Sequence, residues 1–201
     1  RWIRTGKNYG DQVEVERQHN IANLPGKVSV LAYRNKMMLA RFSDATNYIN
    51  QDPNARQGTQ AINNVRTNYQ YKTGFGIHGE QALTNDLGIY GRAFTSDGHT
   101  ETMSFTEADN SISVGMGLNG TSWSRPKDTA GISMMQNGLS SYRKNYLQSG
   151  GVSYFIGDYA GPGQTISYRP ERIGEVYYNA TVIKNVLAGL NFQHINNPAY
   201  N

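Results

Sequence analysis

The strongest constraint on the fold is an alternation of apolar and polar residues, repeated in segments of about ten residues. Successive side chains of a strand point to opposite faces of a sheet, so each such segment has one apolar and one polar face. In the clearest segment, residues 69–81, the apolar members are Tyr71, Phe75 and Ile77, and the polar members are Lys72, His78 and Glu80. The pattern predicts strands that separate an apolar environment from water.

The same alternation predicts roughly eight strands over the chain. The other strands are expected within residues 12–19, 27–34, 87–93, 111–119, 129–137, 175–182 and 188–193. The apolar face then carries Tyr71, Phe75, Ile77, Ile89, Ile112, Val114, Leu118, Val176, Tyr178, Leu190 and Phe192. The polar face carries Lys72, His78, Glu80, Tyr90, Arg92, Glu175 and Tyr177.

The connections between these strands alternate in length. Short turns are expected at Pro25–Gly26, near Asn85, at residues 120–126 and at Lys184–Asn185. Long polar connections cover residues 43–68, 96–109 and 139–169, and the first of them has room for a helical turn within residues 45–65. Short turns on one side and long loops on the other are typical of outer-membrane β-barrels.

Composition narrows the alternatives. No run of about 20 apolar residues exists, which excludes a membrane-spanning helix. With 14 Tyr, 22 Gly and only 17% charged residues, the chain does not have the composition of a disordered protein. The net charge of +4 is not gathered in a basic run, so nucleic acid is not an expected partner. A single domain covering residues 1–201 is the simplest organisation.

Catalytic and metal-binding patterns are weak, so we expect neither an enzyme nor a cofactor. The four histidines, His19, His78, His99 and His194, do not have metal-ligand spacing, and the chain has no cysteine. Residues 157–163 are rich in glycine but lack the Lys and Ser/Thr of a phosphate-binding loop. Glu14 and Glu16 share a strand face, where a charged wall is favoured over a glycosidase pair.

The polar face offers groups that suit sugars. Arg and carboxylate groups make charged hydrogen bonds to hydroxyls, and aromatic rings present flat apolar surfaces to the C–H faces of a sugar ring. Arg92 is the best candidate, because its neighbours along the strand point the other way. For any one of these residues, the alternative is a solvated wall position without a ligand role.

Short motifs are scattered across nearly the whole chain: residues 9–14 (YGDQVE), 25–27 (PGK), 80–83 (EQAL), 123–128 (WSRPKD), 137–141 (NGLSS), 146–147 (YL), 150–151 (GG), 155–158 (FIGD), 168–171 (YRPE), Glu175, 177–178 (YY), Gln193 and 197–201 (NPAYN). Together these motifs resemble the carbohydrate-selective porins of the OprB family. Arg92 matches the arginine of the family's G-(L/I)-(F/Y)-x-R strand.

The resemblance implies a 16-stranded antiparallel barrel in a Gram-negative outer membrane. It implies passive uptake of glucose and similar sugars past arginines and acidic residues at a constriction, with sugars and membrane lipid as partners. This chain would supply roughly eight or nine strands, from the C-terminal half to two-thirds of the family length. Half a barrel would leave two unpaired edges in lipid, so we expect a longer native chain.

Three other functions stay open. A general-diffusion porin would share the fold and lack sugar preference. A soluble carbohydrate-binding β-sandwich would bury the apolar face against a second sheet. A barrel enzyme such as an outer-membrane lipase is disfavoured, because no GxSxG nucleophile motif occurs. The oligomeric state, monomer or trimer, is left open by the sequence.

Overall fold

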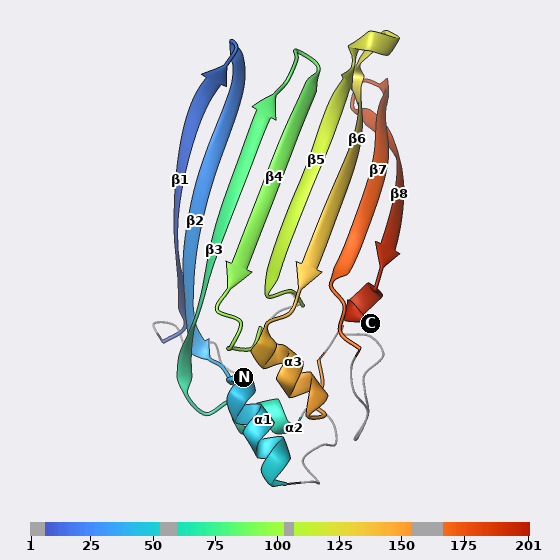
Figure 1. Cartoon of the computed structure of the whole chain (residues 1–201). Coiled ribbons are helices and arrows are strands. Elements are labelled where there is room, and N and C mark those ends of the chain that lie inside the picture. The colour runs from blue at the N-terminus through green and yellow to red at the C-terminus, as the bar shows by residue number, and fades with distance from the viewer. Residues whose placement is uncertain (1–6, 53–59, 103–106, 154–166) are drawn as a thin grey trace.

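Eight antiparallel strands form one sheet in the computed structural model, which describes residues 7–52, 60–102, 107–153 and 167–201 (Figure 1). The strands are β1 (Tyr9–Ile21), β2 (Leu24–Met38), β3 (Tyr69–Ala82), β4 (Leu87–Ser96), β5 (Asn110–Gly120), β6 (Arg125–Gly138), β7 (Glu171–Ile183) and β8 (Val186–Asn196). Each strand pairs with its neighbours in chain order. The all-β prediction with eight strands is confirmed. The predicted glycine-rich loop at residues 157–163 lies outside the described residues, as does the motif at 155–158.

The first hairpin corrects one predicted turn. The turn lies at Ala22–Asn23, and Pro25 is paired with Asn20 inside the ladder. Both turn residues have positive φ, 52° at Ala22 and 64° at Asn23, as a two-residue turn of the hairpin type requires. Proline cannot adopt positive φ, so the Pro25–Gly26 pair could not form this turn.

The remaining short turns lie where they were predicted, at the same end of the sheet as the first (Figure 1). Between β3 and β4, the hydroxyl of Thr84 accepts hydrogen bonds from the backbone N–H of Asp86 at 3.1 Å and of Leu87 at 2.9 Å. A 3₁₀ turn, η2 (Thr121–Trp123), joins β5 to β6. Asn185, with φ of 68°, joins β7 to β8.

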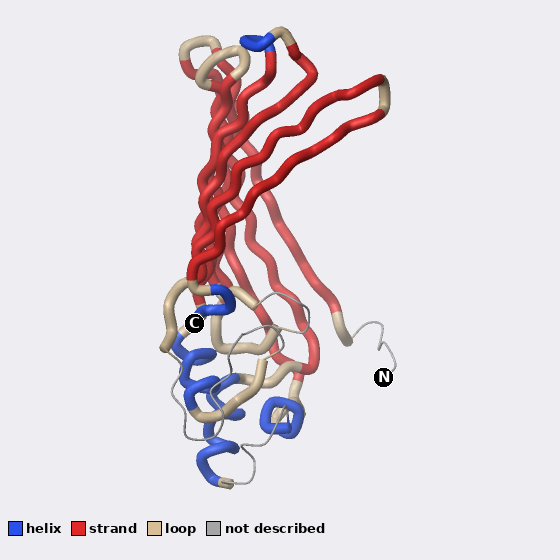
Figure 2. Tube along the Cα trace, turned by 90° about the vertical axis from the view of Figure 1, so that its right-hand side faces the viewer, coloured by secondary structure: helices blue, strands red, loops and turns tan. Residues whose placement is uncertain are grey.

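The long connections gather at the opposite end and contain more helix than the single turn expected. The helices are α1 (Phe42–Gln51), α2 (Gln60–Asn64) and α3 (Ser141–Gln148), and the 3₁₀ turn η3 (Pro198–Tyr200) follows β8. Figure 2 shows the helices packed beyond the strand ends. Their buried apolar cluster consists of Phe42, Ala45, Ile49, Ala61, Leu139, Tyr146, Leu147 and Tyr200. We call this assembly of helices and long connections the loop layer. None of the helices described is long and apolar enough to cross a membrane.

Buried charges hold the loop layer together. The Arg143 guanidinium is 2% exposed and lies 3.4 Å from a carboxylate oxygen of Glu107 and 3.7 Å from one of Asp109. It donates a hydrogen bond to the Thr102 hydroxyl at 2.8 Å and stacks over the Phe42 ring. Since a buried charge is costly without partners, these contacts fix α3 against the connection between β4 and β5.

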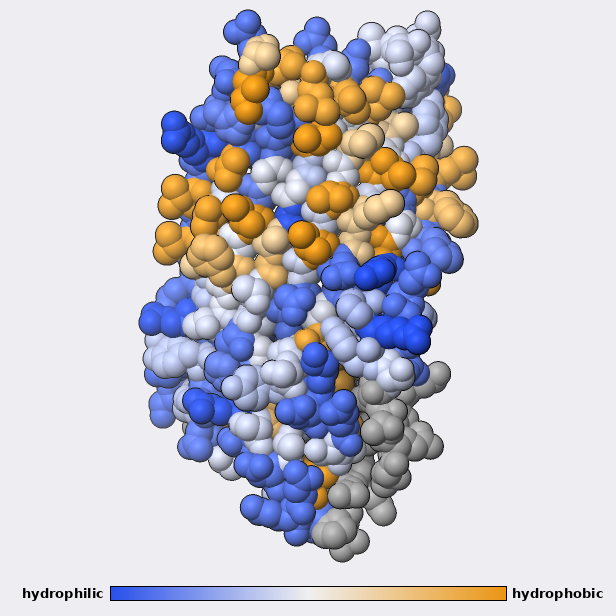
Figure 3. All heavy atoms as spheres, viewed as in Figure 1, coloured by the Kyte–Doolittle hydropathy of each residue, from blue (hydrophilic) through white to orange (hydrophobic). Residues whose placement is uncertain are grey.

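The sheet has one apolar face and one polar face. Figure 3 shows the apolar face, where hydrophobic residues form a broad zone over the strands and the loop layer below is polar. In Figure 2, in which this face lies to the left, the start of β1 and the tip of the β7–β8 hairpin lean to the right. The sheet is thus curved, with the polar face inside the curve.

No second sheet covers the apolar face in the described part of the chain, and its side chains are open. Phe75 is 52% exposed, Val114 is 54% exposed and Leu190 is 79% exposed. A carbohydrate-binding sandwich would bury these residues between two sheets. This exposure contradicts the sandwich interpretation and agrees with a wall that faces an apolar solvent.

Candidate functional site

The ladder registers separate the predicted residues onto the two faces. Directly paired residues share a face, and the pairs Ile77–Ala93, Ala93–Ile112 and Ile132–Val176 belong to the apolar one. All eleven residues predicted for the apolar face lie there: Tyr71, Phe75, Ile77, Ile89, Ile112, Val114, Leu118, Val176, Tyr178, Leu190 and Phe192. Their contact with lipid stays a prediction.

All seven residues predicted for the polar face lie on the opposite side of the sheet, in rows that cross several strands. One row consists of Lys27, Glu80, Tyr90, Gly115, Ser133, Glu175 and Gln193. The next row consists of Ser29, His78, Arg92, Ser113, Met135, Ile173 and Ile195. Lys72 and Tyr177 belong to rows nearer the two ends. Their role in binding sugar stays a prediction.

Charge on this face gathers on β1–β4, in a group that we call the charged belt: Glu16, Lys27, His78, Glu80 and Arg92. The Nζ atom of Lys27 lies 3.2 Å from Oε2 of Glu16, on the neighbouring strand. The Nε2 atom of His78 lies 2.9 Å from Oε1 of Glu80, without the geometry of a hydrogen bond. Glu14 lies on the same face as Glu16, two residues along β1. The belt thus alternates acidic and basic groups across the wall.

Arg92 is the member of the belt that is free to bind a solute. Its side chain is exposed, and its guanidinium carbon lies 5.5 Å from the centroid of the Tyr90 ring. Within the described residues, the guanidinium makes no ion pair and no hydrogen bond with the protein. A guanidinium in this state offers five N–H donors in a planar fork.

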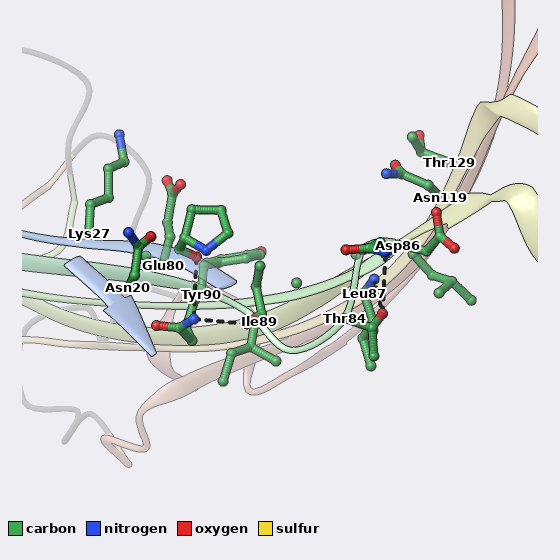
Figure 4. A pocket seen from close by; sticks show the side chains of 18 of the residues that line it. Asn20, Lys27, Glu80, Thr84, Asp86, Leu87, Ile89, Tyr90, Asn119 and Thr129 are labelled. Atoms are coloured by element: carbon green, nitrogen blue, oxygen red, sulfur yellow. Dashed lines mark hydrogen bonds between the residues drawn. The ribbon is translucent and has the colours of Figure 1, made fainter. Parts of the chain in front are cut away.

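Arg92 and its neighbours line an open hollow of about 870 Å³ near the short-turn end of the polar face. Lys27, Glu80, Tyr90 and Tyr177 contribute to the same hollow. Figure 4 shows Lys27 and Glu80 projecting from one side of the strands and Ile89 from the other. A solute in this hollow would meet charged groups and aromatic rings together.

The half of the polar face on β5–β8 carries the carboxylates of Glu171 and Glu175, of which Glu175 is the one predicted as a site residue. Its carboxylate accepts hydrogen bonds from the side-chain amides of Asn191 and of Gln193, the latter at 3.0 Å. A second hollow, of about 400 Å³, includes Glu175, Tyr177 and Asn191. These two hydrogen bonds occupy part of the acceptor capacity of the Glu175 carboxylate, so fewer of its lone pairs remain for a solute.

Lys72 differs from the other polar-face residues, because the connection between β4 and β5 covers it. Its ammonium donates a hydrogen bond to the Thr100 carbonyl oxygen at 3.0 Å and lies 3.8 Å from Oδ1 of Asp97. The residue is 9% exposed. These contacts favour a role in anchoring the loop layer over a role in solute binding.

Sequence reasoning did not include Lys27 among the site residues. With the turn placed at Pro25–Gly26, Lys27 would be the first residue of a strand, next to the turn. The true turn at Ala22–Asn23 puts Lys27 in register with Glu80 and Gln18, well inside the wall. The sequence does contain a signal for the face of Lys27, which is the alternation of Lys27, Ser29, Leu31 and Tyr33 with Val28, Val30 and Ala32.

The histidines do not converge. His19 contacts Gln81 at 3.0 Å, His99 lies 3.7 Å from Asp97, and His194 contacts Asn196 at 3.2 Å. Within the ranges that the structure describes, no three His, Asp or Glu side chains are placed to hold a metal ion.

The chain matches a protein family and a solved structure. The model of the carbohydrate-selective porin, OprB family, matches residues 4–201. A comparison with curated protein sequences finds no match. A solved high-pH structure of OprB from Pseudomonas putida is similar, with a TM-score of 0.70 and 23% sequence identity. The match covers 96% of this chain and 44% of that chain, so this chain spans less than half the length of the solved protein.

Proposed function

The chain belongs to the carbohydrate-selective porin family, OprB, and from this premise we propose that its sheet is part of the wall of an outer-membrane channel for sugars. Sugars would pass by downhill diffusion through a water-filled lumen lined by the polar face. The observation that carries the proposal is the exposed Arg92 guanidinium beside Tyr90, in a hollow of the polar face and without an ion-pair partner among the described residues.

The apolar face supports a membrane location. An exposed apolar surface of this extent is rare on soluble monomers. Apolar residues that face out and polar residues that face in are the pattern of a transmembrane barrel strand. In this arrangement Phe75, Ile89, Val114 and Leu190 contact lipid, and the short turns and long loops lie on opposite sides of the membrane.

The edges of the sheet support a larger barrel. β1 and β8 each pair on one side within the described residues. An open edge in hydrocarbon leaves backbone N–H and C=O groups without partners, which costs several kcal/mol for each group. We propose that further strands of a longer native chain close the barrel, giving the 16 strands that the family resemblance implies.

The proposed selectivity follows from the mixed charges of the belt. Arg92 and Lys27 offer donors, Glu16 and Glu80 offer acceptors, and sugar hydroxyls can use both. The alternating signs keep the local net charge low, which favours neutral solutes over ions. A general-diffusion porin would have no need of an unpaired arginine beside an aromatic ring, but it stays the second candidate until sugar block is measured.

The test is sugar-dependent block of single-channel current through the full-length protein, combined with liposome swelling in sugars of increasing size. Replacing Arg92 with Ala should weaken glucose block roughly tenfold or more, because hydrogen bonds to charged groups contribute roughly 1.5–3 kcal/mol. The matched control is Arg17→Ala, since Arg17 lies opposite Val28 on the apolar face.

Glucose block that is equal in the wild type and the Arg92→Ala variant would reduce Arg92 to a wall position. Open channels whose current no sugar affects would favour the general-diffusion porin.

A further inference from the structure

Two tyrosines of the polar face lie over glycines of neighbouring strands. A Cβ atom added at Gly115 would lie 2.6 Å from Cζ and Oη of Tyr90, and one added at Gly131 would lie 2.5 Å from Cζ of Tyr177. Real Cβ contacts are essentially never so short, so each ring occupies the space that any other residue's Cβ would fill. Figure 4 shows the Tyr90 side chain lying along the strands, whereas Lys27 and Glu80 project away from them.

The two rings approach each other from opposite sides. Tyr90 reaches from β4 over β5, and Tyr177 reaches from β7 over β6. Gly115 pairs with Ser133 and Gly117 pairs with Gly131, so Gly115 and Gly131 are diagonal neighbours, about 7–8 Å apart. The Tyr177 hydroxyl extends further, to 3.6 Å from the Cβ position of Gly117 on β5. The rings therefore cover one continuous stretch of wall, which we call the tyrosine floor.

Polar groups suited to a sugar border this floor. Arg92 contacts the Tyr90 ring, Glu80 is paired with Tyr90, and Glu175 is paired with Ser133. Both rings line the same hollow of about 870 Å³. Flat aromatic surface for C–H groups with charged donors and acceptors at its margin matches the chemistry of a pyranose, which is apolar on its faces and polar around its edge.

The geometry points to the tyrosine floor as a stacking subsite for a neutral pyranose ring, with Gly115 and Gly131 as the residues that keep its rings flat. This inference rests on the proposed sugar channel and deepens it. Tyr33 supplies an internal comparison, because its ring lies over Gly74 in the same manner, at 2.2 Å from the Cβ position. Tyr33 lines a different hollow, near the loop layer.

The experiment measures glucose block of single-channel current in the full-length porin. Tyr90→Ala and Tyr177→Ala should each weaken block about 3- to 10-fold, the range of an aromatic stacking contact. Tyr90→Phe should stay within about twofold of the wild type, because the ring face remains. Gly115→Ala should weaken block as Tyr90→Ala does, since the added methyl group displaces an intact ring.

The matched controls are Tyr33→Ala and Gly74→Ala. They remove the same kind of tyrosine–glycine contact outside the hollow, so any loss of barrel stability should match that of the floor variants while glucose block stays at the wild-type value. Heat-modifiable migration of each variant reports folding, and conductance in KCl reports an open channel.

Four results would overturn the stacking subsite. Equal losses of block in Tyr90→Phe and Tyr90→Ala would assign the effect to the hydroxyl group. Equal losses in the Tyr33 and Tyr90 variants would assign it to barrel stability. If glucose blocks the Tyr90→Ala and Tyr177→Ala channels as strongly as the wild-type channel, the subsite is wrong and the sugar channel still stands. If the wild-type channel shows neither sugar block nor sugar permeation, both the subsite and the sugar channel are wrong.

Discussion

Asp97 is the residue at which pH acts most directly on the loop layer. Its carboxylate is 4% exposed and accepts hydrogen bonds from the backbone N–H groups of Thr73 at 2.9 Å, His99 at 2.9 Å and Thr100 at 3.0 Å. Burial alone would raise the pKa of Asp97, but the hydrogen bonds from Thr100 and Thr73 and the charge of the Lys72 ammonium outweigh it and hold the pKa below the ordinary 3.8.

This lowered pKa predicts acid sensitivity. The ionised carboxylate stabilises the folded loop layer fully above the unfolded pKa, and the contribution is lost as pH falls through the lower folded pKa. Asp97→Asn should therefore increase hydrogen exchange at Thr73 and Thr100 at pH 7, and the difference from the wild type should shrink below pH 4. The control is Asp44→Asn, at an exposed residue of α1. A difference that persists unchanged in acid would show that the carboxylate charge is not involved.

At the scale of single residues, the sequence predicted which face of the sheet a side chain occupies but not which distant residues it contacts. The alternation assigned Arg92, Glu80, Tyr90 and Glu175 to one face, because the direction of a side chain on a strand depends only on its position along that strand. It could not show that Lys72 is hydrogen-bonded to Thr100, 28 residues away. That contact depends on how the connection between β4 and β5 folds back over the wall.

Among the elements, the β1–β2 hairpin has the clearest local conflict. Ala22 adopts φ of 52°, a left-handed conformation that costs a residue with a Cβ roughly 1–2 kcal/mol. Asn tolerates this conformation better, because its short polar side chain can bond locally. Ala22→Asn should therefore stabilise the hairpin, by about 1 kcal/mol.

The opposite substitution tests the sign of this effect. Asn23→Ala places a second alanine at positive φ, 64° in the structure, and should destabilise the hairpin by a similar amount. Hydrogen exchange at Ile21 and Leu24, which pair across the turn, measures both variants. If the two substitutions shift exchange in the same direction, the turn does not depend on its left-handed residues.

Apart from one helical turn, the helices of the loop layer were not predicted from the sequence. In α1, Phe42, Ala45 and Ile49 have helical spacing, but the segment is only ten residues long and lies in an otherwise polar stretch. In α3, the buried residues are Arg143, Tyr146 and Leu147, and the charged Arg143 is buried among partners from other segments of the chain. Such short helices are stabilised by tertiary packing, which local periodicity does not contain.

For the whole molecule, the assignment of one face to lipid and the other to water can be tested at two consecutive residues of β5. Ile112 is 54% exposed on the apolar face, and Ser111 lies on the polar face. An arginine on the lipid side of a barrel costs roughly 2–4 kcal/mol at the bilayer midplane and less towards the interfaces, whereas one on the lumen side remains hydrated.

Ile112→Arg should therefore reduce the heat-modifiable, folded fraction of the full-length porin in lipid vesicles, and Ser111→Arg should leave that fraction near the wild-type value. Because the added guanidinium of Ser111→Arg would project into the lumen, this variant should also alter the conductance of the open channel. The pair shares a strand, a depth in the membrane and an added charge, so the difference isolates the face. If both variants fold equally well, the apolar face does not contact hydrocarbon, and the polar face loses its reason to line a channel.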